Sequence, residues 1–141
     1  MIVVDTNVFS ETLKSSPDEG VMRWLSQHAD EIVTTSITVT ELTFGALRLP
    51  DGRRRTEILE AVAALVDTAG DRVLPFDAVA ARHAAELRAQ REAHGHVVSV
   101  EDTMIAGICQ AGAHRLATRN VRDFDDAGIE LLNPWAAPTG Q

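Results

Sequence analysis

Four acidic residues of the sequence occur where a strand-forming run gives way to a helical segment. Asp5 ends the apolar run "MIVV", Glu41 follows a second such run, and Asp102 opens the segment "SVEDTMIAGICQAG". The fourth, Asp123, lies in "LATRNVRDF", one turn after another strand-forming stretch. Clustered carboxylates repel one another and raise each other's pKa values unless cations lie between them. The set therefore predicts a site for Mg²⁺ or Mn²⁺, which prefer hard oxygen ligands.

A site of this kind fits hydrolysis of a phosphodiester. One bound ion, or two about 4 Å apart, can turn water into a nucleophile and stabilise the oxygens of an in-line displacement at phosphorus. The sequence has no histidine and cysteine pattern at zinc spacing, so zinc chemistry is not indicated. The metal-water mechanism does not require the ribose 2′-hydroxyl. It therefore does not separate RNA from DNA as the substrate.

Each acid alone also has a structural explanation. Asp5 can cap the helix that follows it, and Glu41 can be an exposed residue in a first helical turn, where negative charge is favoured. Ser99 and Asp102 have the spacing of a capping box, with Asp in place of the usual Glu. The metal-site interpretation depends on the four acids occurring together.

The scaffold that must position these acids alternates short strand-forming runs with longer helical segments. The continuous apolar run Ile2–Val4 is typical of a central strand covered on both faces. Such alternation builds right-handed βαβ units, and ligands then bind outside the carboxyl ends of the parallel strands. We therefore expect a three-layer α/β/α domain with a central, mainly parallel β-sheet. Strands are expected at 2–4, 32–37, 72–76, 115–118 and 130–132, and helices at 7–13, 18–28, 39–47, 56–67, 77–94, 100–111 and 121–126.

Four segments of the chain occur in the order typical of one known family. They are "IVVDTNVF", "SITVTELTFGALRLP", "HVVSVEDTMIAG" and "LATRNVRDF". Together they resemble the signatures of PIN-domain proteins, specifically the VapC and FitB-like toxins of bacterial toxin–antitoxin pairs. The departures are mild, because Thr103 and Met104 stand where small or aliphatic residues are common, and Gly107 replaces a usual Ala. None of these departures removes an acid.

The resemblance implies a PIN fold and a Mg²⁺-dependent endoribonuclease. It places the acidic quartet on Asp5, Glu41, Asp102 and Asp123, and we expect a supporting polar shell made by Asn7, Thr118 and Asn120. It also implies a homodimer, inhibited by a small cognate antitoxin whose C-terminal segment occupies the active-site groove. The particular RNA, its cleavage sequence and the number of metal ions stay open.

Composition limits how such a protein can hold nucleic acid. The 141 residues predict a single PIN domain over 1–141, with a loosely held tail at about 134–141. The net charge is −8, which argues against a general polyanion binder that works by bulk positive charge. RNA contacts are therefore expected from a few arginines, namely Arg48, Arg119 and Arg122. The single cysteine and the lack of a long apolar run predict a cytoplasmic protein outside the membrane.

Two other classes of protein compete with this prediction. A phosphatase of the haloacid-dehalogenase type would use Asp5 as a covalent nucleophile. Such enzymes usually have a second Asp two positions on and a late lysine, whereas this chain has Asn7 there and Lys14 as its only lysine. The other class is a non-enzymatic module in which the acids are helix caps and the protein works by docking a partner.

Overall fold

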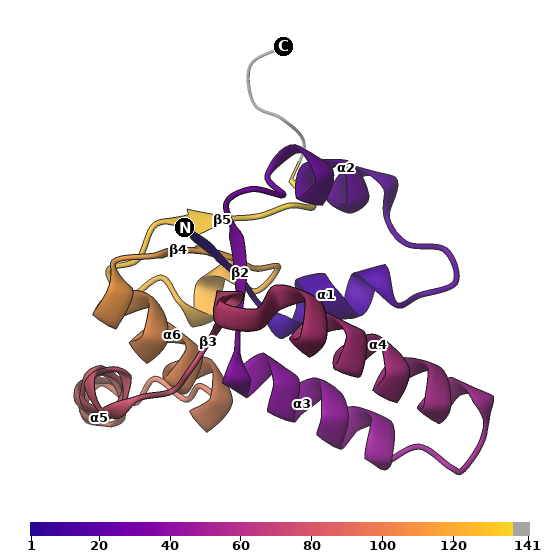
Figure 1. Cartoon of the computed structure of the whole chain (residues 1–141). Coiled ribbons are helices and arrows are strands. Elements are labelled where there is room, and N and C mark those ends of the chain that lie inside the picture. The colour runs from indigo at the N-terminus through magenta and orange to yellow at the C-terminus, as the bar shows by residue number, and fades with distance from the viewer. Residues whose placement is uncertain (137–141) are drawn as a thin grey trace.

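The structure, a computed structural model that describes residues 1–136, has five parallel strands at its centre (Figure 1). Their order across the sheet is β3-β2-β1-β4-β5, so β1 is the central strand, as its continuous apolar run predicts. All four pairings are parallel. The strands are β1 (Ile2–Val4), β2 (Ile32–Thr35), β3 (Val73–Leu74), β4 (Arg115–Ala117) and β5 (Leu131–Leu132).

The helices form a layer on each face of this sheet. In Figure 1 the pair α5 and α6 lies on one side of the strands, and α1 to α4 lie on the other. The predicted three-layer α/β/α architecture is therefore confirmed. The helices are α1 (Thr6–Thr12), α2 (Glu19–Gln27), α3 (Ser36–Leu47), α4 (Arg53–Ala69), α5 (Ala78–Ala93) and α6 (Val100–Gly112), with short 3-10 turns at η1 (Gly70–Arg72) and η2 (Val121–Asp123).

Successive residues of β1 pack into different layers. Val3 belongs to a core cluster with Ile105 of α6 and Leu116 of β4. Val4 belongs to a second cluster with Val8 of α1 and Val21 of α2. Because side chains alternate across a strand, a strand with helices on both faces is apolar at every position. This burial fixes the central strand, and with it the place where Asp5 leaves the sheet.

The beginning of α3 differs from the sequence prediction. Strand β2 ends at Thr35 rather than at residue 37, and α3 begins at Ser36 rather than at Val39. The hydroxyl of Thr35 accepts a hydrogen bond from the Thr38 amide at 3.1 Å and caps the helix. Glu41 consequently lies in the second turn of α3. Its prediction as a first-turn residue is wrong.

Other boundaries shift for similar local reasons. Helix α4 begins at Arg53, three residues before the predicted start. The helix predicted over 121–126 is only the 3-10 turn η2, and the Asn120 side chain makes no capping hydrogen bond there. The tail predicted at about 134–141 falls partly on residues 137–141, which lie outside the described residues. Within the described part, Trp135 packs against the cluster of Val4, Val8 and Val21.

Gly107 is explained by the close approach of α5 to α6. A Cβ at this position would lie 2.6 Å from the Ala80 carbonyl oxygen and 2.9 Å from the Ala84 Cβ. The alanine that is usual here in the family would therefore collide with the backbone of α5. The glycine is a packing requirement of this chain and leaves the acidic residues untouched.

We expect Gly107→Ala to lower the free energy of unfolding by about 1–3 kcal/mol, the usual cost of overpacking. The matched control is Gly45→Ala, because a Cβ at Gly45 in α3 meets nothing within 4 Å. That control should stabilise the protein by about 0.5–1 kcal/mol through helix propensity. Urea unfolding of both variants measures the difference. Equal stabilities of the two variants would contradict the packing explanation.

None of the helices within residues 1–136 is both long enough and apolar enough to cross a membrane.

Candidate acidic active site

Asp5 lies directly after β1, at the carboxyl edge of the sheet. Its side chain is 3% exposed and accepts hydrogen bonds from the Thr6 amide at 2.8 Å and the Thr118 hydroxyl at 2.7 Å. Asp5 therefore does cap α1, as its structural explanation required, but capping uses only one carboxylate oxygen. Burial raises the pKa of Asp5 from 3.8 to about 6, against the effect of the Thr118 hydrogen bond. The negative charges of Asp102 and Glu41 raise this pKa further.

Glu41 is joined to the neighbourhood of Asp5 through Thr6. The Thr6 hydroxyl contacts Glu41 Oε1 at 2.7 Å and Thr38 Oγ1 at 3.2 Å. Burial raises the pKa of Glu41, the Thr6 hydrogen bond lowers it, and the charge of Asp102 raises it. Glu41 is thus partly buried and directed toward the other acids. It is not the freely exposed helix residue of the alternative explanation.

Asp102, in the first turn of α6, and Asp123, in the 3-10 turn η2, complete the set. Ser99 caps α6 by accepting a hydrogen bond from the Asp102 amide at 3.1 Å, which is one of the two hydrogen bonds of a capping box. Burial raises the pKa of Asp102, the Ser99 side chain lowers it, and the charge of Asp123 raises it. Asp5, Glu41 and Asp102 therefore lie within electrostatic reach of one another, and Asp123 lies within reach of Asp102. Asp5 follows β1, and Glu41 lies in α3 after β2. Asp102 lies in α6 after α5, and Asp123 lies in η2 after β4.

Thr118 is the centre of the polar shell around Asp5. It is fully buried at the end of β4, where its hydroxyl accepts from the Asn120 amide at 3.0 Å and from Asn7 Nδ2 at 3.4 Å. Asn7 Oδ1 in turn accepts from the Arg119 amide at 3.4 Å. All three residues predicted for the polar shell therefore meet beside Asp5. Asn120 contributes its backbone amide to this contact.

The three arginines predicted to contact RNA lie in different settings. Arg119 is exposed next to Thr118, with its guanidinium carbon 5.0 Å from the centre of the Trp135 ring. Arg122 is exposed on η2, beside Asp123. Arg48 follows α3, stacks over Phe44 at 5.5 Å, and is two helical turns from Glu41. Arg119 and Arg122 are therefore adjacent in the chain to Thr118 and Asp123, and Arg48 is seven residues after Glu41.

The chemical types of the donors at this site suit a hard divalent cation, although the carboxylates do not form a closed cluster in the described residues. Its buried carboxylates have raised pKa values because ionisation is unfavourable without a compensating positive charge. Their oxygens, with no thiolate among them, suit Mg²⁺ or Mn²⁺. Burial also raises the pKa of the nearby Cys109 thiol to about 12, which keeps it protonated in the core. In the described range, no three His, Cys, Asp or Glu side chains are close enough together to enclose an ion.

Several residues of this neighbourhood were missed by the sequence prediction. Thr6 and Thr38 bridge α1 and α3, and the only signal for them is their position beside the motifs "DTN" and "SITVTE". Arg91 of α5 is buried beneath η2, where it binds Asp126 and the Asp123 carbonyl. Asp126 is exposed overall, and its carboxylate nevertheless binds the Arg91 guanidinium. The pairing joins residues 35 positions apart, a distance at which sequence pattern gives no signal.

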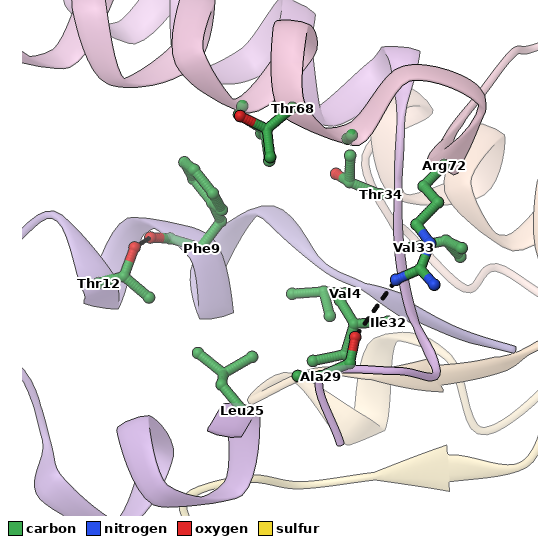
Figure 2. Close-up of a pocket in the computed structure, with 12 residues that line it drawn as sticks. Val4, Phe9, Thr12, Leu25, Ala29, Ile32, Val33, Thr34, Thr68 and Arg72 are labelled. Carbon is green, nitrogen blue, oxygen red and sulfur yellow. Dashed lines mark hydrogen bonds between the residues drawn. The ribbon is translucent and has the colours of Figure 1, made fainter. Parts of the chain in front are cut away.

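A separate apolar pocket of about 360 Å³ lies between α1, α2, β2 and α4 (Figure 2). Phe9, Leu25 and Leu65 line it, and Arg72 at its edge donates a hydrogen bond to the Ala29 carbonyl at 3.3 Å. The Thr34 hydroxyl faces this space and has no hydrogen-bond partner within the described part of the chain. None of the four acids lines the pocket. The acidic site and this pocket are therefore distinct.

The fold and the site define a class of protein, and the comparison with known families agrees with them. The sequence matches the PIN domain family over residues 2–130, so the chain belongs to that family. Within the family its relatives are toxins and ribonucleases of the VapC and FitB group. The resemblance seen in the four sequence motifs is thereby confirmed.

Two curated relatives and one solved structure show how far this likeness extends. The chain is 40% identical to VapC ribonuclease Y4jK of Sinorhizobium fredii over 144 residues, covering 96% of this chain and 98% of the relative. It is 33% identical to toxin FitB of Neisseria gonorrhoeae over 137 residues, covering 96% of this chain and 99% of the relative. The crystal structure of FitAcB from the same organism matches with a TM-score of 0.88 at 32% identity, covering 97% of this chain and 100% of that chain.

Proposed function

We propose that this protein is the toxin component of a type II toxin–antitoxin system and acts as a Mg²⁺-dependent endoribonuclease. The observation on which the proposal rests is the gathering of Asp5, Glu41 and Asp102 at the carboxyl edge of the sheet, each with a raised pKa. Perturbed acids that meet in one place are typical of functional sites. The ribonuclease name of the S. fredii relative supports RNA as the substrate.

The chain's own residues have separate tasks in this reaction. Asp5, Glu41, Asp102 and Asp123 supply the carboxylates that hold the cation. The Thr118 and Thr6 hydroxyls orient two of these carboxylates by donating hydrogen bonds at 2.7 Å. Arg119 and Arg122 offer positive charge to the RNA backbone beside the acids. When bound, Mg²⁺ supplies Lewis acidity toward phosphate oxygens and lowers the pKa of bound water.

Neither competing class of protein is favoured. A covalent phosphatase needs a second aspartate two positions after Asp5, and Asn7 is instead bonded to the Thr118 hydroxyl and the Arg119 amide. A purely structural role for the acids would leave them as solvated helix caps. Asp5 is instead buried, and Glu41 and Asp102 are partly buried and near one another. Membership of the PIN-domain family agrees with the nuclease.

The test of the proposal is metal-dependent cleavage of RNA by the purified protein. We expect Mg²⁺ to support cleavage, a chelator to abolish it, and Mn²⁺ to restore it. Asp102→Asn should reduce the rate by at least about 100-fold, because it removes a metal-binding carboxylate. Asp125→Asn, the same change at an exposed acid two residues after Asp123, should leave the rate unchanged. Equal rates for wild type and Asp102→Asn would refute the metal mechanism.

The same assay addresses the substrate and the physiological target. Parallel reactions with DNA of the same sequence test the preference for RNA. This test is needed because the metal-water mechanism works on either nucleic acid. Sequencing the ends of transcripts cut after induction in cells identifies the target. These measurements separate the type of nuclease from its specificity.

An antitoxin partner is supported by the solved neighbours of this fold, which are VapBC and FitAB toxin–antitoxin complexes. We propose that a small cognate antitoxin binds this chain and that its C-terminal segment enters the groove of the acids. A short reading frame upstream of the gene, encoding a small DNA-binding protein, would identify it. The homodimer implied by the family stays a prediction, which light scattering of the purified protein measures.

A further inference from the structure

Arg91 is a buried positive charge that the proposed reaction does not use. It lies near the end of α5, and its side chain is only 3% exposed. Burying a guanidinium group is unfavourable unless its charge and its donors are satisfied. The Asp126 carboxylate satisfies the charge as a bidentate partner, with Nε to Oδ2 at 3.0 Å and Nη2 to Oδ1 at 2.8 Å.

The other donors of Arg91 reach the two segments that bear Asp102 and Asp123. Nη1 donates to the Thr103 hydroxyl at 2.9 Å, one residue after Asp102 in the first turn of α6. Nη2 donates to the backbone carbonyl of Asp123 itself at 2.6 Å. A guanidinium group is planar and rigid, so these contacts fix the two segments relative to each other. A single side chain of α5 thus links α6 to η2 beneath the acidic site.

The partners of Arg91 are themselves held in place. The Thr103 hydroxyl donates to the Ser99 carbonyl at 3.0 Å, and His96 Nδ1 lies 3.1 Å from Asp126 Oδ2. The hydrogen bond from Arg91 holds the pKa of Asp126 below its usual range. The charge of Arg91 also opposes the burial that raises the pKa of Asp102. The network therefore connects to the acids both mechanically and electrostatically.

We propose that Arg91 is a positioning residue of the acidic site, which sets the separation of Asp102 and Asp123 without touching metal or RNA. This inference rests on the proposed function, because it assumes that the two acids bind a cation together. A buried ion pair does not by itself favour stability over an apolar pair of the same volume. Positioning of Asp102 and Asp123 would explain why a buried guanidinium group is present at residue 91.

Arg91→Lys tests the role, since lysine keeps the positive charge and loses the rigid fork of donors. We expect the Kd for Mn²⁺, measured by calorimetry on the metal-free protein, to rise about 10- to 100-fold, the usual effect of losing a residue that orients a metal ligand. Hydrogen exchange of residues 119–127, measured in chelator, should become faster. Asp126→Asn, which leaves Arg91 in place but weakens its anchor, should show a smaller change of the same sign.

Leu87→Ala is the packing control, because Leu87 is buried on the same helix in the core cluster with Ile105 and Phe124, and its apolar side chain donates no hydrogen bond to either segment. It should lower thermal stability and leave the Kd for Mn²⁺ unchanged. Wild-type Mn²⁺ affinity in folded Arg91→Lys would overturn the positioning role alone. If Arg91→Lys does not fold, the Asp126→Asn result decides in the same way. Wild-type protein that binds no Mn²⁺ would instead overturn the proposed function, and the inference with it.

Discussion

Asp5→Asn is expected to abolish RNA cleavage and, in the absence of metal, to make the protein more stable. The loss of rate should be at least about 100-fold, because Asp5 is the most buried of the four acids and lies within reach of Asp102 and Glu41. A rise in pKa from 3.8 to about 6 on folding costs the ionised form about 3 kcal/mol, at about 1.4 kcal/mol for each tenfold change in proton affinity. Asparagine does not ionise, so it removes this cost.

The pH dependence of stability gives the sign of this effect. The pKa of Asp5 is higher in the folded than in the unfolded protein, so the folded protein binds more protons between about pH 4 and pH 6. The contribution of Asp5 to the free energy of unfolding is therefore fully present below about pH 4 and is lost as the pH rises through about 6. The advantage of Asp5→Asn should be small at about pH 4 and reach about 1–3 kcal/mol at about pH 7, allowing for the altered hydrogen bond to Thr118.

Urea unfolding in chelator at the two pH values measures this advantage. Asp77→Asn is the matched control, since Asp77 caps α5 by accepting from the Ala80 amide at 2.9 Å, away from the acids. Asn caps a helix nearly as well as Asp, so the control should change stability by less than about 0.5 kcal/mol at either pH. An Asp5→Asn variant that is less stable than wild type at about pH 7 would mean that Asp5 is simply a structural cap.

Much of the fold and the acidic set was predictable because both depend on short-range patterns. The continuous apolar run Ile2–Val4 identifies a strand buried on both faces, and parallel topology then requires its carboxyl end to face the binding edge. The four acids could be proposed for the same reason, since each lies within two helical turns of the end of a strand or the start of a helix. Their types and places are local properties of the sequence, and only their convergence needs the fold.

What the sequence could not predict depends on contacts between distant segments. The start of α3 was misplaced because "TTSITVTE" suits a strand as well as a helix, and the Thr35 cap decides between them. Gly107 looked like a neutral departure from the family until the α5 backbone was found beside it. The sequence around Arg91 gives no indication that its side chain is buried. Its burial follows from packing against α6 and η2, which no local pattern encodes.

Thr118→Val is expected to reduce RNA cleavage by about 10- to 100-fold while leaving all four acids in place. The Thr118 hydroxyl donates to Asp5 Oδ2 at 2.7 Å and accepts from the Asn120 amide at 3.0 Å. Valine has nearly the same shape but no hydroxyl, so it leaves a buried carboxylate with one donor fewer. Losing that donor raises the pKa of Asp5 further. A metal ligand must be deprotonated, so Mn²⁺ binding should weaken. The pH at which half of the bound Mn²⁺ is lost on acidification should also rise.

Thr34→Val distinguishes this effect from the packing effect of the same substitution. Thr34 is also buried, on β2, but its hydroxyl has no partner within the described residues, so removing it should change stability by less than about 1 kcal/mol. Thr118→Val should instead cost about 1–3 kcal/mol, because it breaks bonds to buried groups. The cleavage rate and the pH dependence of Mn²⁺ binding should therefore be unchanged in Thr34→Val. In Thr118→Val the rate should fall and the Mn²⁺ binding curve should shift to higher pH. If the two variants behave alike, Thr118 contributes only shape, and the orientation of Asp5 must come from the Thr6 amide alone.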